Sequence, residues 1–181
     1  MTVNVNPETS RLQSAAWRED IWSQFQREQV ELFAYLPDGG LDFLIRRLQA
    51  EAPEHGVMLT TEEEGVGICC GAWLGGKRSI MAIQSSGVGN CINAFSLITN
   101  CRFPFFLLVS MRGEFGEGNP WQVPMGRITA DVLRLSGFHV FEARRDDEAA
   151  SLVAGGLAMA YRSEEPVAVL LSQRLIGAKA L

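Results

Sequence analysis

The sequence contains several short, uninterrupted runs of apolar residues, and these runs constrain the fold more than any other feature. In the run from Phe105 to Val109, five consecutive side chains are apolar, so both faces of the segment have to be covered. Strands that are covered on both faces are typical of a parallel sheet lying between two layers of helices. Such runs alternate six times with segments of helical periodicity. The sequence therefore predicts an α/β fold, with a six-stranded parallel sheet and helices on both faces.

The expected strands are apolar runs bounded by turn residues, at 30–36, 57–60, 79–83, 103–109, 139–142 and 166–171. The expected helices carry apolar residues at intervals of three and four, at 16–28, 41–50, 62–74, 91–99, 129–136 and 146–161. We expect residues 111–127 to form a long loop, because they combine Gly and Pro with no periodicity. Residues 1–14 are expected to be a flexible N-terminal lead, followed by one domain at 15–181.

Composition and charge exclude several classes of protein. The chain has 181 residues and a formal net charge of −5, so it has no electrostatic reason to bind nucleic acid or an anionic membrane surface. No stretch approaches the roughly 20 apolar residues of a membrane helix, and the N-terminus lacks the pattern of a signal peptide. The cysteines lack zinc-ligand spacing, and we expect buried, reduced thiols in a cytoplasmic protein without metal ligands of its own: Cys69, Cys70, Cys91 and Cys101.

Ligands of parallel α/β sheets bind beyond the carboxyl ends of the strands, so the loops that follow the expected strands are the candidate site. These loops are 37–40, 61–64, 84–90 and 111–127. The segment Ser85–Asn90 follows a strand and opens a helix, so its amides could hold an anion. It matches neither a dinucleotide fingerprint, because Ile92 stands where a glycine is needed, nor a Walker phosphate loop. A tight strand-to-helix turn explains the residues equally well.

Three glutamates follow Thr61 at the start of an expected helix, and they admit a structural and a functional interpretation. Thr61 and Glu64 have the spacing of a capping box, and acidic residues suit the first turn of a helix. Glu62 and Glu63, however, lie at the head of the apolar stripe that continues through Val66. A carboxylate on the buried side of a helix start, beyond a strand end, is a candidate for proton chemistry. The sequence contains no nucleophile elbow.

Two of these segments together resemble a known family. Glu63-Glu64-Gly65-Val66-Gly67 and Gln84-Ser85-Ser86-Gly87-Val88-Gly89-Asn90 resemble the pyrimidine-binding (PYR) domain of thiamine diphosphate enzymes, and Pro37-Asp38-Gly39-Gly40 resembles the loop after its first strand. Gly118-Asn119-Pro120-Trp121-Gln122-Val123-Pro124-Met125-Gly126 is most similar to the alpha subunits of the sulfopyruvate and phosphonopyruvate decarboxylase family. The resemblance spans roughly residues 30–171.

The resemblance implies a catalytic glutamate and a set of cofactor contacts. The glutamate would be Glu63, which would share a proton with the aminopyrimidine ring of thiamine diphosphate and so help the cofactor to lose its thiazolium proton. The implied cofactor-binding residues come from three loops: Pro37, Gly39, Gly40, Glu63, Gln84, Ser85, Ser86, Gly87 and Asn90.

The resemblance also implies the reaction, which is decarboxylation of a 2-oxo acid to an aldehyde and CO2. The favoured substrates, 3-sulfopyruvate and 3-phosphonopyruvate, carry a second anion that guanidinium groups can bind. The expected substrate-binding residues are Arg112, Gln122 and Arg127. In the structural alternative, the two arginines only pair with Glu114 and Glu117 on a solvated loop.

The family normally holds the diphosphate and Mg²⁺ through a Gly-Asp-Gly motif followed by Asn in a second domain. No Gly-Asp-Gly occurs in the 181 residues. We therefore expect half of an active site, completed by a beta subunit that carries the motif in a hetero-oligomer. Two alternatives stay open: the PYR subunit of an acetolactate-type carboligase, and a non-catalytic PYR-like binding or regulatory subunit. A flavodoxin-like nucleotide binder fits the glycine pattern less well.

Overall fold

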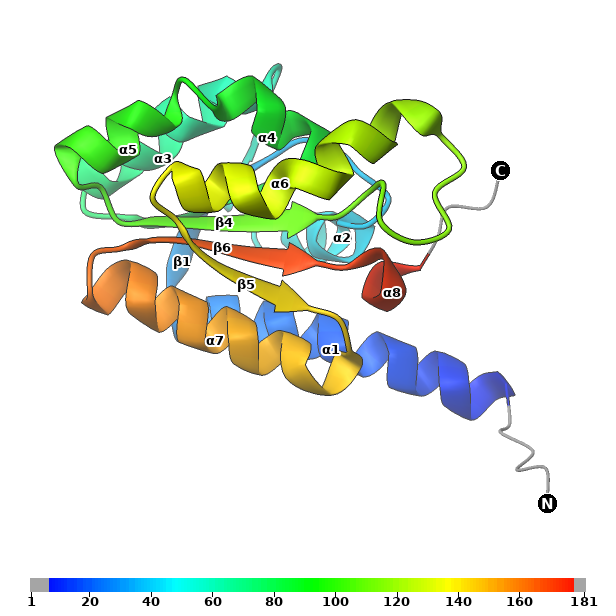
Figure 1. Ribbon diagram of the computed structural model, residues 1–181. Helices are drawn as coiled ribbons and strands as arrows, with labels where there is room; N and C mark the ends of the chain where they lie inside the picture. Colours follow the sequence, from blue (N-terminus) through cyan, green and yellow to red (C-terminus); the bar gives the residue numbers. More distant parts are fainter. Residues whose placement is uncertain (1–6, 178–181) are drawn as a thin grey trace.

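The computed structural model describes residues 7–177 and contains one six-stranded sheet (Figure 1). All neighbouring strands are parallel, in the order β2-β1-β3-β4-β6-β5. Their bounds are β1 (Val30–Tyr35), β2 (Gly56–Met58), β3 (Arg78–Gln84), β4 (Phe105–Ser110), β5 (His139–Ala143) and β6 (Pro166–Leu171). The predicted six-stranded parallel sheet is confirmed.

Helices cover both faces of the sheet, as predicted (Figure 1). One face is covered by α1 (Pro7–Arg27), α2 (Asp42–Glu51) and α7 (Asp146–Arg162). The other face is covered by α3 (Glu62–Leu74), α4 (Ser85–Cys91), α5 (Phe95–Cys101) and α6 (Val123–Leu135). Three short helical turns complete the chain: η1 (Pro53–His55), η2 (Pro120–Gln122) and α8 (Gln173–Ile176). None of the helices within residues 7–177 is long and apolar enough to cross a membrane.

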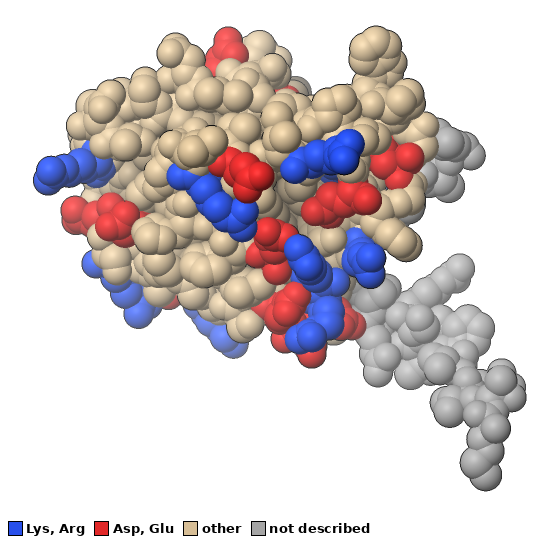
Figure 2. Space-filling view, viewed as in Figure 1, with Lys and Arg blue, Asp and Glu red and all other residues tan. Residues whose placement is uncertain are grey.

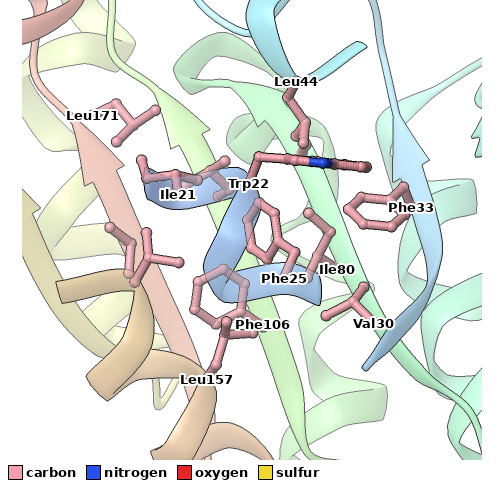
Figure 3. Close-up of a cluster of buried hydrophobic side chains, with 14 of the residues drawn as sticks. Ile21, Trp22, Phe25, Val30, Phe33, Leu44, Ile80, Phe106, Leu157 and Leu171 are labelled. Atoms are coloured by element: carbon pink, nitrogen blue, oxygen red, sulfur yellow. The ribbon is translucent and has the colours of Figure 1, made fainter. Parts of the chain in front are cut away.

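The strands alternate their side chains between two separate apolar cores. In β4, Phe106 and Leu108 face the layer of α1, α2 and α7, whereas Leu107 faces the layer of α3 to α6. Ile21 and Phe25 of α1 are fully buried against the first core, and Figure 3 shows them beside residues of β1, β3 and β4. Burying a side chain of this size contributes roughly 1.5–3 kcal/mol. Packing on both faces therefore holds the strands in place, and with them the starts of the loops at their carboxyl ends.

Helix α1 begins earlier than predicted. It starts at Pro7, so residues 7–14, which we expected to be part of a flexible lead, are helical, and residues 1–6 of that lead lie outside the described residues. A proline suits the first turn of a helix because the missing N–H has no partner there in any case. The apolar stripe that begins at Trp17 packs on the sheet.

Two segments that we expected to be loops are partly helical. Helix α4 begins at Ser85, directly after β3, and ends at Cys91, so the helix predicted at 91–99 is divided between α4 and α5. Helix α6 begins at Val123, inside the predicted loop 111–127. In α6, packing overrides weak helix propensity. Gly126 lies so close to the backbone of the preceding loop that an added Cβ would be 1.9 Å from the carbonyl oxygen of Arg112.

The cysteines are free thiols, and three of the four are buried as predicted. Burial raises the pKa of Cys69 to about 12 and that of Cys70 to about 11. Burial, followed by the charges of Glu62 and Glu63, raises the pKa of Cys91 to about 12. Cys101 is exposed at the end of α5, contrary to the prediction, because the last turn of that short helix leaves the core.

Charged side chains of both signs are interleaved on the face of the molecule shown in Figure 2. Ion pairs join such neighbours at the start of α7, where Arg145 Nε lies 3.0 Å from Asp147 Oδ1. This face therefore carries no large patch of a single sign.

Candidate active site

β1 and β3 are neighbours in the sheet, and the connections that leave their carboxyl ends run in opposite directions across it. From β1 the chain moves outward to β2 on one side, and from β3 it moves outward through β4 on the other. Parallel α/β sheets bind ligands at such a switch point. The loop after β1 (residues 36–41) and the start of α4 after β3 lie at this place. Both contain predicted cofactor-binding residues.

A buried carboxylate, Asp38, joins the loops of this edge. Its Oδ1 accepts hydrogen bonds from Gln84 Nε2 at 2.8 Å and from Arg112 Nη2 at 3.2 Å. Its Oδ2 accepts hydrogen bonds from the Gly40 amide and from Ser110 Oγ, both at 2.8 Å. Burial acts to raise the pKa of Asp38, but the hydrogen bonds from Gln84 and Ser110 and the charge of Arg112 outweigh it and lower the pKa below its ordinary value.

The start of α4 is connected to this carboxylate from two directions. Ser86 Oγ donates to Gln84 Oε1 at 2.7 Å, so Ser86 is linked to Asp38 through the amide of Gln84. Ser85 Oγ accepts from the Arg112 amide at 3.0 Å. The structure therefore brings together predicted residues from 37–40 and 84–86, together with Asp38, which the sequence analysis did not select.

The glycines of the β1 loop differ in what surrounds them. An added Cβ at Gly40 would lie within 2.9 Å of Ser110, Asp38 and Ile176, so Gly40 is required for packing of the loop. At Gly39 the nearest atom would be Arg112 Nη2, at 3.8 Å, so that side of the loop is open. Pro37 is exposed beside them. Gly39 and Gly40 also line a hollow of about 520 Å³ between α1 and α2.

Among the three glutamates at the start of α3, the one that contacts α4 is Glu62 and not the predicted Glu63. Asn90 Nδ2 donates to Glu62 Oε2 at 2.8 Å, and an added Cβ at Gly87 would lie 2.4 Å from Glu62 Cγ. The Glu62 side chain is partly buried, whereas Glu63 is exposed. Successive helix residues turn by about 100°, so only one of the two can point at α4.

The third glutamate, Glu64, holds the helix start, but with a different partner than predicted. Thr61 makes no side-chain cap. Instead, Glu64 Oε2 accepts from both the amide and the hydroxyl of Thr60, each at 2.9 Å. These hydrogen bonds, with that from the Thr60 amide the largest cause, lower the pKa of Glu64. Its role is therefore structural, one residue displaced from a capping box.

The three predicted substrate-binding residues lie in different surroundings. Arg112 is buried and pairs with Asp38, with both side chains 8% exposed. Gln122, in η2, has a buried Oε1 for which residues 7–177 supply no hydrogen-bond donor. Arg127 is exposed in the second turn of α6, away from the side on which Gly126 and Thr129 are buried. The structure does not bring Arg127 into contact with the other two.

Neither arginine pairs with Glu114 or Glu117, so the structural alternative for them is wrong. Glu114 Oε2 instead accepts from the Ser172 hydroxyl and the Gln173 amide, at 2.9 and 3.0 Å. Glu117 Oε2 accepts from Gln173 Nε2 at 2.9 Å. These contacts fix the loop after β4 to the short helix α8. The described part of the chain contains no cluster of three or more His, Cys, Asp or Glu side chains that could hold a metal ion.

No protein-family model matches the sequence, but curated proteins do. The alpha subunit of sulfopyruvate decarboxylase from Methanococcus maripaludis is 32% identical over 154 residues, which cover 84% of this chain and 92% of that protein. The alpha subunit from Methanocaldococcus jannaschii is 31% identical over 83% of this chain and 89% of that protein.

The chain belongs to the family of sulfopyruvate decarboxylase alpha subunits. This membership confirms the resemblance found in the sequence. Phosphonopyruvate decarboxylase from Streptomyces viridochromogenes is 32% identical over 82% of this chain, which matches only 38% of that longer protein.

Solved structures show the same fold at lower identity. Benzoylformate decarboxylase from Polynucleobacter necessarius superposes with a TM-score of 0.70 at 16% identity, over 91% of this chain and 31% of that chain. A 2-oxoglutarate:ferredoxin oxidoreductase from Magnetococcus marinus gives 0.72 at 17% identity, over 88% of this chain and 29% of that chain. At these identities the likeness is one of fold alone. In both cases the alpha-subunit fold corresponds to about a third of a larger chain.

Proposed function

We propose that this chain is the alpha subunit of a two-subunit, thiamine diphosphate-dependent decarboxylase that converts 3-sulfopyruvate, or alternatively 3-phosphonopyruvate, to the aldehyde and CO2. The observation that carries the proposal is the contact of one partly buried glutamate, Glu62, with Gly87 and Asn90 at the switch point of a chain of this family. Family membership supplies the reaction, and this contact supplies a group for the proton chemistry.

The residues at the switch point fit the aminopyrimidine part of thiamine diphosphate. Glu62 offers a carboxylate of which one oxygen, Oε2, is fixed by Asn90, and the missing Cβ of Gly87 lets the two helices meet closely. Gln122 Oε1 is a buried acceptor in need of a donor. A ring with a basic nitrogen suits a carboxyl group, and an amino group suits an acceptor oxygen that still lacks a donor.

Glu62 takes over the role that the sequence analysis gave to Glu63. Its carboxyl group would hold a proton against a ring nitrogen, and Asn90 would keep the group oriented while the proton is exchanged. When bound, thiamine diphosphate supplies the carbon nucleophile and the electron sink of the reaction. The start of α4, with Ser85, Ser86 and Gly87, would lie along the cofactor and help to exclude water from it.

The diphosphate and Mg²⁺ would be held by a beta subunit that carries the Gly-Asp-Gly…Asn motif. The proposal is supported by relatives that are named as alpha subunits and match this chain over about nine-tenths of their length. In two longer decarboxylases, from Methanosarcina acetivorans and Streptomyces viridochromogenes, the matching part is 37% and 38% of the chain. Those proteins have room for a second domain in the same polypeptide. Free thiols suit a cytoplasmic complex.

Of the predicted substrate-binding residues, Arg127 is the one available to a second substrate anion. Arg112 already neutralises Asp38, and Gln122 presents an acceptor oxygen that an anion would not favour. Arg127 has no carboxylate within salt-bridge distance in residues 7–177 and lies in the second turn of α6, near the carboxyl edge. We therefore assign the sulfonate or phosphonate to Arg127, and orientation of the bound molecules to Gln122.

Product analysis of the complete complex tests the proposal. The chain is co-purified with its beta subunit and supplied with thiamine diphosphate, Mg²⁺ and 3-sulfopyruvate, 3-phosphonopyruvate or pyruvate. We expect sulfoacetaldehyde or phosphonoacetaldehyde with one CO2 per substrate. Acetolactate from pyruvate as the main product would assign the complex to carboligation, and a complex that forms no product would support a non-catalytic subunit.

A further inference from the structure

Asp38 has no part in the proposed reaction, yet its carboxylate receives hydrogen bonds from more segments of the site than any other side chain described above. Its side chain is only 8% exposed. A carboxylate has about four lone-pair sites, and four donors reach it: the Gly40 amide, Gln84, Ser110 and Arg112. It therefore has no capacity left to bind a ligand directly.

The four donors come from the three segments that border the candidate site. Gly40 belongs to the loop after β1, Gln84 ends β3, and Ser110 ends β4, with Arg112 just beyond it. We propose that Asp38 is a positioning residue, which sets the placement of the loops after β1, β3 and β4 around the bound cofactor. The inference rests on the proposed function, because it takes the switch point to be the cofactor site.

The contacts beyond Asp38 lead to the catalytic glutamate. Gln84 is fixed by Asp38 on one side and accepts from Ser86 Oγ on the other. Ser86 precedes Gly87, the residue against which Glu62 packs. A shift of Gln84 would thus move the start of α4 relative to Glu62. The second connection runs through Arg112, whose amide donates to Ser85 Oγ.

The charge and shape of Asp38 both matter to this role. An amide in its place has one oxygen, which accepts about two hydrogen bonds, while its NH2 group would face the remaining donors. Asp38→Asn therefore releases about half of the contacts and leaves the buried guanidinium of Arg112 without a charge partner, which is unfavourable. Ser110→Ala is a milder change, because it removes a single donor and keeps the Cβ.

A matched control lies at the opposite edge of the sheet. Glu28 also joins distant segments, accepting from Arg78 Nη1 at 3.0 Å and Arg162 Nη2 at 2.7 Å, with its side chain 16% exposed. Arg78 opens β3, so this contact is at the amino edge, away from the site. Glu28→Gln thus removes a comparable bridging carboxylate whose role is to hold the fold.

The test compares the wild-type alpha–beta complex with its Asp38→Asn, Ser110→Ala and Glu28→Gln variants. Calorimetry gives the dissociation constant for thiamine diphosphate in the presence of Mg²⁺, and amide hydrogen exchange reports on residues 38–40 and 84–87. We expect Asp38→Asn to weaken cofactor binding about tenfold or more and Ser110→Ala about threefold, with kcat at saturating cofactor reduced less than the affinity. Exchange should become faster at both segments, and Glu28→Gln should change only the melting temperature.

Three results have distinct meanings. Unchanged cofactor affinity in both Asp38→Asn and Ser110→Ala would overturn the positioning role. Unchanged exchange at residues 38–40 and 84–87 would overturn it as well, without reference to any activity. A wild-type complex that binds no thiamine diphosphate would overturn the proposed function, and is recognised before any variant is compared. Because Ser110→Ala keeps the ion pair, it decides the question if Asp38→Asn does not fold.

Discussion

Asn90 donates a hydrogen bond of 2.8 Å to Glu62, across 28 positions of sequence, and so joins the last turn of α4 to the first turn of α3. The contact decides which of three consecutive glutamates faces the switch point. It leaves Glu63 exposed and Glu64 bound to Thr60. The proton chemistry of the proposed reaction is therefore assigned to Glu62.

The first prediction concerns this assignment. Glu62→Gln keeps the size of the side chain but cannot exchange a proton, so we expect kcat of the alpha–beta complex to fall by about 10²–10⁴. The matched control is Glu63→Gln, which changes an exposed neighbour and should leave kcat within about twofold, as surface substitutions usually have small effects. Steady-state rates of CO2 release measure both. A large loss in Glu63→Gln with little loss in Glu62→Gln would return the role to Glu63.

The second prediction concerns the close approach of α3 and α4. In Gly87→Ala the new Cβ would be placed 2.4 Å from Glu62 Cγ, so the glutamate has to move away from the site. We expect kcat to fall by about tenfold or more, since small displacements of a catalytic group are costly. Gly89→Ala is the control, because its Cβ would meet only the flexible Met125 side chain, at 3.2 Å. A kcat for Gly87→Ala as high as that of Gly89→Ala would show that the reaction does not depend on the position of Glu62.

The third prediction concerns the second anion of the substrate. Arg127→Ala should raise KM for 3-sulfopyruvate by about tenfold, the loss of one charge-assisted hydrogen bond. KM for pyruvate, which lacks the sulfonate, should change little in the same variant. Initial rates over a range of each substrate measure the difference. An equal effect on both substrates would mean that Arg127 supports the fold or the subunit interface.

The fourth prediction concerns assembly with the beta subunit. Trp121 is 87% exposed, and its backbone is held by the Asn119 side chain, which accepts from the Trp121 amide at 3.1 Å. An exposed tryptophan on a fixed turn at the carboxyl edge is a suitable anchor for a partner, so Trp121→Ala should weaken subunit affinity by about tenfold or more. Leu135→Ala is the control, as Leu135 is 89% exposed at the other end of α6. Calorimetric titration of the beta subunit into each alpha variant measures its affinity. If Trp121→Ala and Leu135→Ala bind the beta subunit equally well, Trp121 is not an anchor of the interface.

The sheet could be predicted from the sequence because each strand is a short apolar run bounded by turn residues, which is a local pattern. The run at 105–109 is apolar throughout and too short for a typical buried helix, so it indicates a strand covered on both faces. The start of α6 was not predicted, since it depends on Gly126 packing against the backbone of Arg112, a contact that no local pattern reveals. Helix α1 was predicted only from Ala16 onward, because the apolar stripe that indicates it begins at Trp17.

The loops of the candidate site were predicted, and Gln84, Ser86 and Asn90 with them, but the sequence analysis did not select Glu62 or Asp38 as site residues. Glu62 could have been selected, because Val66 and Cys70 follow it at intervals of four and share its side of α3. Asp38 could not have been selected in this way. Its role depends on Gln84, Ser110 and Arg112, which the sequence separates and only the parallel order of β1, β3 and β4 brings together.

Dependence of the reaction on a second subunit is the most direct test of the account. Release of CO2 from 3-sulfopyruvate is followed while purified beta subunit is titrated into a fixed amount of this chain, with thiamine diphosphate and Mg²⁺ present throughout. The account predicts a rate at background for either subunit alone, and a rate that rises with added beta subunit until the complex is saturated. Decarboxylation by this chain alone, at a rate that added beta subunit leaves unchanged, would contradict it.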